Sequence, residues 1–295
     1  MKTKRVHQLN KKIISLKKQK NMRSIFLSIG FFTALFIGVQ AQKFEIQSVV
    51  IHGGTFRMGQ SVAGEETGFD VTLDTYRMSI YEITNDQYCY FLNEKKDYSK
   101  EIEQWINIDG NSVDDPNMLY LDWKTDTYKV QPGFENHPVV YVSWQGAMAF
   151  SQWVGGCLPT EAQWEYACRA GTTTRFNTGS CLDASDANYN ANTPFEGCSK
   201  GEFRNTLLKV GSFSSNPWGL YDMHGNAWEW CLDWYADYTL VSKENPVGPP
   251  SGENKVRRGG SYLVNGRSSF TAHRNVAPPS SMFSDLGFRV VFNHE

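Results

Sequence analysis

Two stretches of the sequence place side chains where they could do chemistry. The first, GLYDMHGNAWEWCLDWY, sets Asp222, Asn226, Glu229 and Asp233 around a glycine within residues 219–235. Ca²⁺ needs several hard oxygens from carboxylates and carbonyls in flexible geometry, so the segment is a candidate calcium site, although its spacing is not that of an EF-hand loop. The alternative is structural: the tryptophans form core and the acids form a solvated face.

The second stretch, RGGSYLVNGRSSFTAHR at 258–274, combines a glycine pair, small hydroxyl residues, further arginines and a histidine, but it has no cysteine. A triad could be drawn from Ser261, His273 and an aspartate, yet GGSYL is not the G-x-S-x-G turn that exposes a nucleophilic serine. No H-E-x-x-H pairing or phosphate-cradling glycine loop is present either. We therefore expect neither a hydrolase triad nor a histidine-based transition-metal centre.

Three helices are expected to position these stretches. Each begins at a hydroxyl residue that can cap it: Thr84 in YEITNDQYCYFLNEKK, Ser143 in VSWQGAMAFSQWVGG and Thr160 in LPTEAQWEYACRAG. A glutamine follows Thr84 and Thr160 after three residues, which is the capping-box pattern. Gly155 and Gly171 are the expected stops of the second and third helices.

Regular periodicity is weak elsewhere. FEIQSVVIHGGTFRMG predicts two short strands separated by a Gly-Gly turn. From residue 172 to the end, Gly, Asn, Ser and Pro alternate with aromatics, so this part needs side-chain caps, a disulfide or bound ions to satisfy its backbone. We predict an α+β fold with much irregular structure, in a single domain over residues 42–295.

Residues 1–41 have the plan of a secretory signal peptide. A basic head precedes an apolar run from Ile25 to Val39, and small residues stand at −3 and −1 of a cleavage point after Ala41. Met22 is an alternative start, because the sequence from that residue is a complete signal by itself. An uncleaved anchor is the other reading, but the apolar run is shorter than the roughly 20 residues that span a bilayer. We expect export, with no transmembrane segment after cleavage.

Cleavage would leave an acidic protein. The first 41 residues carry nine of the 29 basic residues and none of the 31 acidic ones, so the mature chain has 20 against 31, a net charge of −11. Such a chain is a poor partner for nucleic acid and anionic membranes. It suits hard cations such as calcium.

All six cysteines lie in the mature part, where an oxidising compartment permits disulfides. Cys181 and Cys198 flank a loop rich in Asn, Asp, Ser and Gly, where a cross-link would restrict the unfolded chain most. We favour this pair, and the remaining connectivity stays open.

Seven blocks, in this order, resemble the formylglycine-generating enzyme (sulfatase-modifying factor) family over residues 45–292. They are GGTFRMGQ, YEITNDQYCYFLN, HPVVYVSWQGAMAFSQWVGG, LPTEAQWEYACRAG, NPWGLYDMHGNAWEWCLDWY, RRGGSYL and DLGFRVV. The resemblance implies a C-type-lectin-like fold held by calcium and disulfides.

The resemblance also implies a site that this chain lacks. Catalytic members bind copper(I) with two cysteines after RGGSY and oxidise a cysteine within a sulfatase C-x-P-x-R motif to formylglycine. The matching positions here are Val264 and Ser269, in a segment about three residues shorter than the family pattern. Copper(I) is soft and prefers thiolates, so copper is not expected.

Other family positions are carried over by the same resemblance. One calcium site maps to Asp222 and Glu229 by side chain and to Gly225 and Ala227 by carbonyl; a second maps to Asn188, Tyr189, Glu202 and Arg204. Trp228, Ser261 and Arg274 match a peptide groove, with a structural role as the alternative: Trp228 as core and Arg274 paired with an acid. Cys168 matches a disulfide cysteine whose partner position is Thr271, so a buried free thiol is expected.

Three functions are compatible with these observations. The favoured one is an exported, calcium-stabilised, monomeric non-oxidase that binds a peptide, protein or glycan in the groove, or serves in an envelope assembly. The alternative is an active sulfatase-modifying oxidase with a variant site. A related iron-dependent sulfoxide synthase would need a separate helical domain, for which the chain has no room.

Overall fold

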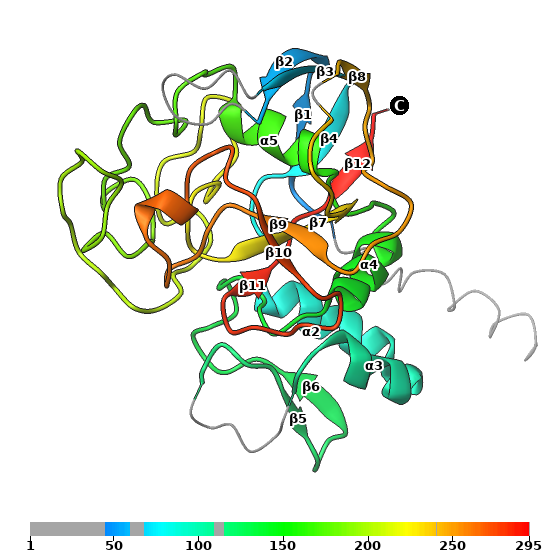
Figure 1. Ribbon diagram of the computed structural model, residues 1–295. Coiled ribbons are helices and arrows are strands. Elements are labelled where there is room, and N and C mark those ends of the chain that lie inside the picture. The colour runs from blue at the N-terminus through cyan, green and yellow to red at the C-terminus, as the bar shows by residue number, and fades with distance from the viewer. Residues whose placement is uncertain (1–44, 60–67, 109–114, 240, 295) are drawn as a thin grey trace, which may run out of the picture. The chain divides into compact units, whose positions relative to one another are not determined.

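The computed structural model of the protein describes residues 45–59, 68–108, 115–239 and 241–294. Residues Ile46–Glu295 form one compact unit (Figure 1). The expected signal segment 1–41 lies outside the described residues. Within the described ranges, no helix has the length and apolar character to cross a membrane.

The three expected helices form where their caps predict them. They are α2 (Asn85–Glu94), α4 (Trp144–Trp153) and α5 (Glu161–Arg169). The side chains of Thr84, Ser143 and Thr160 each accept a hydrogen bond from the backbone N–H three residues on, and both capping boxes are complete. Helices α4 and α5 both end just before their expected glycines: Gly155 and Gly171 follow the C-cap residues with φ of +82° and +87°.

The two early strands form but do not pair with each other. Strand β1 (Ser48–Ile51) pairs antiparallel with β4 (Tyr76–Ser79), and β2 (Gly54–Met58) pairs antiparallel with β3 (Phe69–Leu73). Strand β12 (Val291–Asn293) completes the first sheet, and β8 (Lys243–Glu244) completes the second in parallel. The Gly-Gly turn therefore passes the chain from one sheet to another.

The long irregular part is real over residues 172–227, where the structure has no helix or strand. After it comes a four-stranded sheet of order β10-β9-β7-β11 that the sequence did not predict. Its strands are β7 (Trp228–Trp234), β9 (Lys255–Arg258), β10 (Asn275–Ala277) and β11 (Leu286–Gly287). Strand β7 is buried on both faces along most of its length, so its sequence WEWCLDW shows none of the alternation that marks a half-exposed strand.

The sequence also did not predict a short helical segment and a β-hairpin. A 3₁₀ turn η1 (Lys96–Tyr98) leads into α3 (Ser99–Trp105), and β5 (Tyr120–Asp122) pairs with β6 (Thr127–Lys129). Only Ile102 of α3 is buried, so the sequence of this helix lacks the repeat of apolar residues that predicts an amphipathic helix. The hairpin turn contains no glycine and uses Asp126 at φ +51° instead.

Helix α5 lies between the sheet of β2 and β3 and the sheet of β7 and β9 (Figure 1). Its Trp164 and Ala167 pack in one core with Val71 of β3 and Val256 of β9. The 3₁₀ turn η2 (Gly266–Ser268) belongs to the loop that follows β9.

Candidate functional site

The loop of residues 259–274 leaves β9 through a bend that requires its glycine pair. Gly259 and Gly260 have φ of +95° and +81°, and a Cβ on Gly260 would lie 2.5 Å from Ser269 Oγ. Because any larger residue would be strained and would collide with Ser269, the bend fixes where the loop returns.

Val264 and Ser269, the positions that the resemblance matches to the family's copper-binding cysteines, provide no soft ligand. Ser269 is fully buried, and its hydroxyl donates to the carbonyl of Asn265 at 3.3 Å. Val264 is half-buried, and its carbonyl accepts from the N–H of Asn190 at 2.9 Å. The alkyl group cannot ligate a metal, and the hydroxyl is a neutral hard donor already used inside the protein.

One thiol does reach this loop, through a contact hidden by sequence distance. Cys168 Sγ lies 3.8 Å from Thr271 Oγ1 and 3.8 Å from His224 Nε2. Its side chain is fully buried, and burial raises the pKa of the thiol to about 12. A protonated, enclosed thiol is a poor ligand and nucleophile, since the thiolate is the reactive form.

His224 is held neutral next to that thiol. Its Nδ1 pairs with the carbonyl of Ser269 at 2.8 Å, and its Nε2 accepts from the N–H of Asn177 at 3.1 Å. Burial lowers the pKa of His224 to about 4. The ring therefore joins the loop to the irregular segment before β7 and has no spare nitrogen for acid–base work at neutral pH.

Trp228 and Ser261 are brought together with residues that sequence reasoning missed. Both side chains are buried, so they support a surface rather than line it. Ser261 Oγ donates to Asp285 Oδ2 at 2.6 Å, and the Trp228 ring lies 4.9 Å from the guanidinium of Arg257. Asp285 opens the block DLGFRVV, which was the only sequence signal that could have pointed to it.

Arg274 pairs with an acid, as its structural alternative proposed. Its Nε and Nη2 each donate at 2.7 Å to a different oxygen of Glu161, and the guanidinium lies 3.8 Å from the Tyr238 ring. Arg274 also borders a cavity of about 270 Å³ that Asp233 lines. Burial, and then the charge of Glu161, raises the pKa of Asp233 to about 7.

Beneath the loop lies a buried network of ion pairs, which we call the α5 frame: Glu161, Glu165, Arg169, Arg258 and Arg274. Arg258 is fully buried, forms an ion pair with Glu165 and donates to the carbonyl of His273. Glu165 also accepts from Arg169 Nη2 at 2.7 Å. Paired charges of this kind cost much desolvation, so each member depends on its partners.

In the first expected calcium set, the Glu229 carboxylate is engaged by other side chains. Both oxygens of Glu229 accept from Arg289, at 2.6 and 2.7 Å, and one also accepts from Trp164 Nε1 at 2.6 Å. Asp222 accepts from the N–H of Gly211, and burial raises its pKa to about 6. These three hydrogen bonds use most of the acceptor capacity of the carboxylate, so Glu229 is an ion-pair member here, and calcium binding by this set stays a prediction.

The second expected set fits better. Asn188 is buried, and its Oδ1 has no hydrogen-bond partner among the described residues, while its Nδ2 donates to Thr206 and Asn226. The Glu202 side chain is 68% exposed and meets Arg204 at 3.4 Å. A buried, unsatisfied amide oxygen suits a hard cation. Across the described residues, no group of three or more His, Cys, Asp or Glu side chains is arranged as a metal cluster.

Gly225 and Ala227 connect these two sets. Gly225 pairs with Asn188 through an isolated parallel bridge, and a Cβ on it would lie 2.2 Å from the Asn188 carbonyl oxygen. The N–H of Ala227 donates to Glu82 at 3.0 Å. The structure therefore places 188 and 225 side by side, whereas the sequence treated them as two separate sites.

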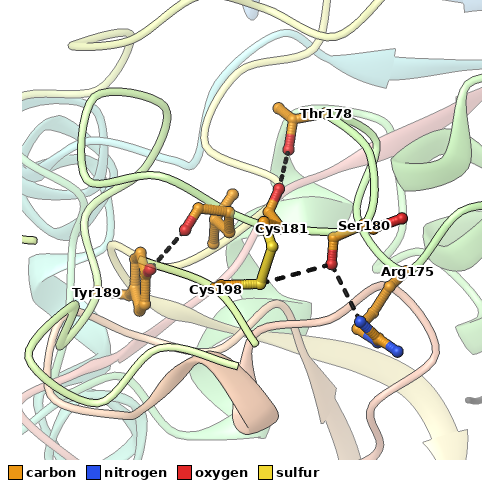
Figure 2. Close-up of a disulfide and its surroundings, with 7 residues drawn as sticks. Arg175, Thr178, Ser180, Cys181, Tyr189 and Cys198 are labelled. Atoms are coloured by element: carbon orange, nitrogen blue, oxygen red, sulfur yellow. Dashed lines mark hydrogen bonds between the residues drawn. A yellow bond between two sulfur atoms is a disulfide. The ribbon is translucent and has the colours of Figure 1, made fainter. Parts of the chain in front are cut away.

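A disulfide joins Cys181 and Cys198, the pair favoured from the sequence (Figure 2). Figure 2 shows it beside Tyr189, whose hydroxyl donates to the Leu182 carbonyl at 2.5 Å. The other four cysteines are free: Cys89, Cys157, Cys168 and Cys231. The cross-link closes the irregular segment next to Asn188 and Tyr189.

The chain resembles known proteins over most of its length. A family described as sulfatase-modifying factor enzyme 1-like domain matches residues 37–294. The formylglycine-generating enzyme of Bos taurus is 32% identical over 287 residues, covering 83% of this chain and 74% of that protein. The serine/threonine-protein kinase pkn1 of Chlamydia caviae is 32% identical over 259 residues, which cover 85% of this chain but 38% of the kinase. The inactive C-alpha-formylglycine-generating enzyme 2 of Mus musculus is 29% identical, covering 82% and 84%.

Solved structures share the fold at lower identity. Treponema denticola variable protein 1 superposes with a TM-score of 0.63 at 22% identity, covering 84% of this chain and 95% of that one. PvdO from Pseudomonas aeruginosa gives 0.59 at 24% identity, covering 84% and 94%. At these identities the likeness establishes the fold alone, and it supports the expected α+β class.

Proposed function

The chain belongs to the sulfatase-modifying factor enzyme 1-like family, and from that premise we propose that it is a non-oxidase member that binds a ligand where catalytic members do chemistry. One observation carries the proposal: the positions of the catalytic thiols hold Val264 and a buried Ser269. Copper(I) needs thiolates, and neither side chain provides one. The relative named inactive C-alpha-formylglycine-generating enzyme 2 is a precedent for an inactive family member.

The ligand of the proposed surface is a peptide, a protein or a glycan, and a peptide or protein suits the exposed side chains best. Leu263 and Phe283 are 41% and 42% exposed, and each lies two residues from the hydrogen-bonded pair Ser261–Asp285. The Phe283 ring also lies 5.3 Å from the Arg257 guanidinium. Apolar anchors on a rigid base are what protein recognition uses.

The oxidase test is direct. Purified protein is incubated with a peptide containing the C-x-P-x-R motif, copper and oxygen, and the products are analysed by mass spectrometry. No aldehyde is expected, because no thiolate pair is available to hold copper(I). Formation of formylglycine would refute the non-oxidase proposal and favour the alternative, an oxidase with a variant site.

The binding surface has its own test. A photo-crosslinking amino acid at position 263 is expected to give a discrete adduct in cells that make the protein, whereas the same group at Val241, which is 61% exposed, is not. Equal labelling at both positions would show that residue 263 has no privileged partner.

Export and calcium belong to the same proposal. The signal-like segment 1–41 supports export, and the unsatisfied Asn188 Oδ1 supports one structural calcium ion near Glu202. Calcium is expected to raise the melting temperature of the protein. The Glu202→Gln variant is expected to need about tenfold more calcium for the same rise. Glu196→Gln is the matched control, because Glu196 is also an exposed acid that meets an arginine, with a side chain 82% exposed against 68% for Glu202. A Glu202→Gln response like that of the control would place the ion elsewhere or nowhere.

A further inference from the structure

A second cavity lies away from the loop 259–274. It has a volume of about 700 Å³ and is bounded by the η1–α3 segment, by the β5–β6 hairpin and by Ser280 and Met282. Helix α3 and the hairpin lie next to each other at the lower edge of Figure 1. This volume is within the usual range of ligand sites. We call it the hairpin cavity.

The floor of the hairpin cavity is apolar. Ile102 and Ile106 are buried, and Tyr128 is 8% exposed. The Tyr128 backbone is fixed because its N–H and carbonyl both bond the side chain of Asn93, at 2.9 and 3.0 Å. These buried side chains give the cavity an apolar floor that a side chain entering it can contact.

Trp123 stands at the wall of the same cavity and is 79% exposed, far more than any other tryptophan named here. The hairpin that carries it is rigid, because Lys129 Nζ pairs with Asp122 at 2.6 Å and the hydroxyls of Thr125 and Thr127 meet at 2.7 Å. A ligand that covers this solvent-exposed indole would bury a large apolar surface, which is favourable. Trp123 is therefore a candidate contact residue.

The charge around the cavity selects the ligand. Glu103 and Asp126 line it, and neither forms an ion pair within the described part of the chain. After burial, the charges of Asp126 and Glu103 raise the pKa of Tyr128, which lines the same cavity. Lys96 is the one basic residue in the lining. Two carboxylates beside the exposed indole of Trp123 attract an organic cation through ion pairing and cation–π contact.

We propose that the hairpin cavity binds a basic peptide, with an arginine side chain seated between Trp123 and the carboxylates of Glu103 and Asp126. The guanidinium would donate to both carboxylates and stack on the indole. The excess of acidic residues in the chain, 31 against 29 and larger after cleavage, favours the approach of such a peptide. The lining of the hairpin cavity includes neither Leu263 nor Phe283, the two exposed residues of the surface proposed above.

The test uses acetyl-Gly-Arg-Arg-Gly-amide and its citrulline counterpart, which keeps the shape of arginine but removes the charge, in calorimetric titrations of the purified protein. The arginine peptide is expected to bind at least about tenfold more tightly than the citrulline peptide. Trp123→Ala is expected to weaken it about tenfold, and Glu103→Gln and Asp126→Asn about threefold or more each. Asparagine tolerates the left-handed backbone of residue 126, so this variant changes the charge alone.

Glu101→Gln is the matched control, because it removes an exposed carboxylate from the same helix outside the cavity lining. Its affinity should stay within about twofold of the parent, and thermal unfolding checks that every variant is folded. The proposal is overturned if the arginine peptide does not bind at millimolar concentration, if citrulline binds equally, or if Glu101→Gln loses as much as Glu103→Gln. It is also overturned if a neutral oligosaccharide binds in a Trp123-dependent way while the peptide does not.

Discussion

The α5 frame and the loop 259–274 are in contact, yet their side chains interact in different ways. In the α5 frame every charge is buried against an opposite charge, as in the pairs Arg258–Glu165 and Arg274–Glu161. In the loop, the two family metal positions carry a half-buried alkyl group and a hydroxyl bonded to the backbone. Under the proposed function, the frame is kept for stability while the chemistry above it is lost, because the two use different residues.

The largest expected effect breaks the frame. Arg258→Ala would leave the carboxylates of Glu161 and Glu165 buried without their shared partner, so we expect the free energy of unfolding to fall by about 3–5 kcal/mol. Urea unfolding followed by circular dichroism measures it. Arg267→Ala, which removes an ion pair whose side chains are 64% and 82% exposed, should change it by less than about 0.5 kcal/mol. Similar losses in both variants would mean that burial of the pair is unimportant.

The next effect concerns the irregular segment that supports the loop. The Cys181–Cys198 cross-link spans 17 residues. Replacing both cysteines by serine should lower the unfolding free energy by about 3 kcal/mol, because the unfolded chain regains the freedom that the cross-link removes. Replacing the buried free Cys89 by serine is the control, because it removes a thiol outside this segment without removing a cross-link. A double variant as stable as the parent would show that bonding within the segment suffices.

A smaller effect comes from pH. The pKa of Asp233 is about 7 in the folded protein, and an unfolded aspartate titrates near 3.9, so between these values the folded state binds the extra proton. Stability should therefore fall as the pH rises from about 4 to 7 and then level off. Asp222, with a pKa of about 6, acts in the same direction.

Asp233→Asn can still accept from the N–H of Glu161, as Asp233 Oδ2 does at 2.8 Å. It should reduce the difference in unfolding free energy between pH 5 and pH 8 by on the order of 2 kcal/mol. Unfolding curves at the two pH values give this difference, and an unchanged difference in the variant would assign the pH dependence to other groups.

The same contrast explains what the sequence could predict. Local signals worked: Thr160 and Gln163 are three residues apart, and their capping box starts α5 where expected. Contacts over long separations were invisible, among them Cys168 with Thr271 across 103 residues and Arg274 with Glu161 across 113. The resemblance named Glu229 as a calcium ligand, but its pairing with Arg289, 60 residues away, could not be read from spacing.

Regular elements were missed for related physical reasons. Strand β7 is buried on both faces and shows no alternation, and α3 buries a single side chain. The β5–β6 hairpin turns through Asp126 without a glycine, so its usual marker is missing. Val264 and Ser269 could be located from the sequence because the neighbouring RGGSY block fixes their register.

The most direct test of the central claim is a copper(I) titration against a chromophoric chelator under reducing conditions, with the double variant V264C/S269C as the reference. We predict that the parent protein leaves copper(I) on the chelator, whereas the double variant, which restores two thiols, withdraws it. Stoichiometric removal of copper(I) by the parent protein would contradict the account.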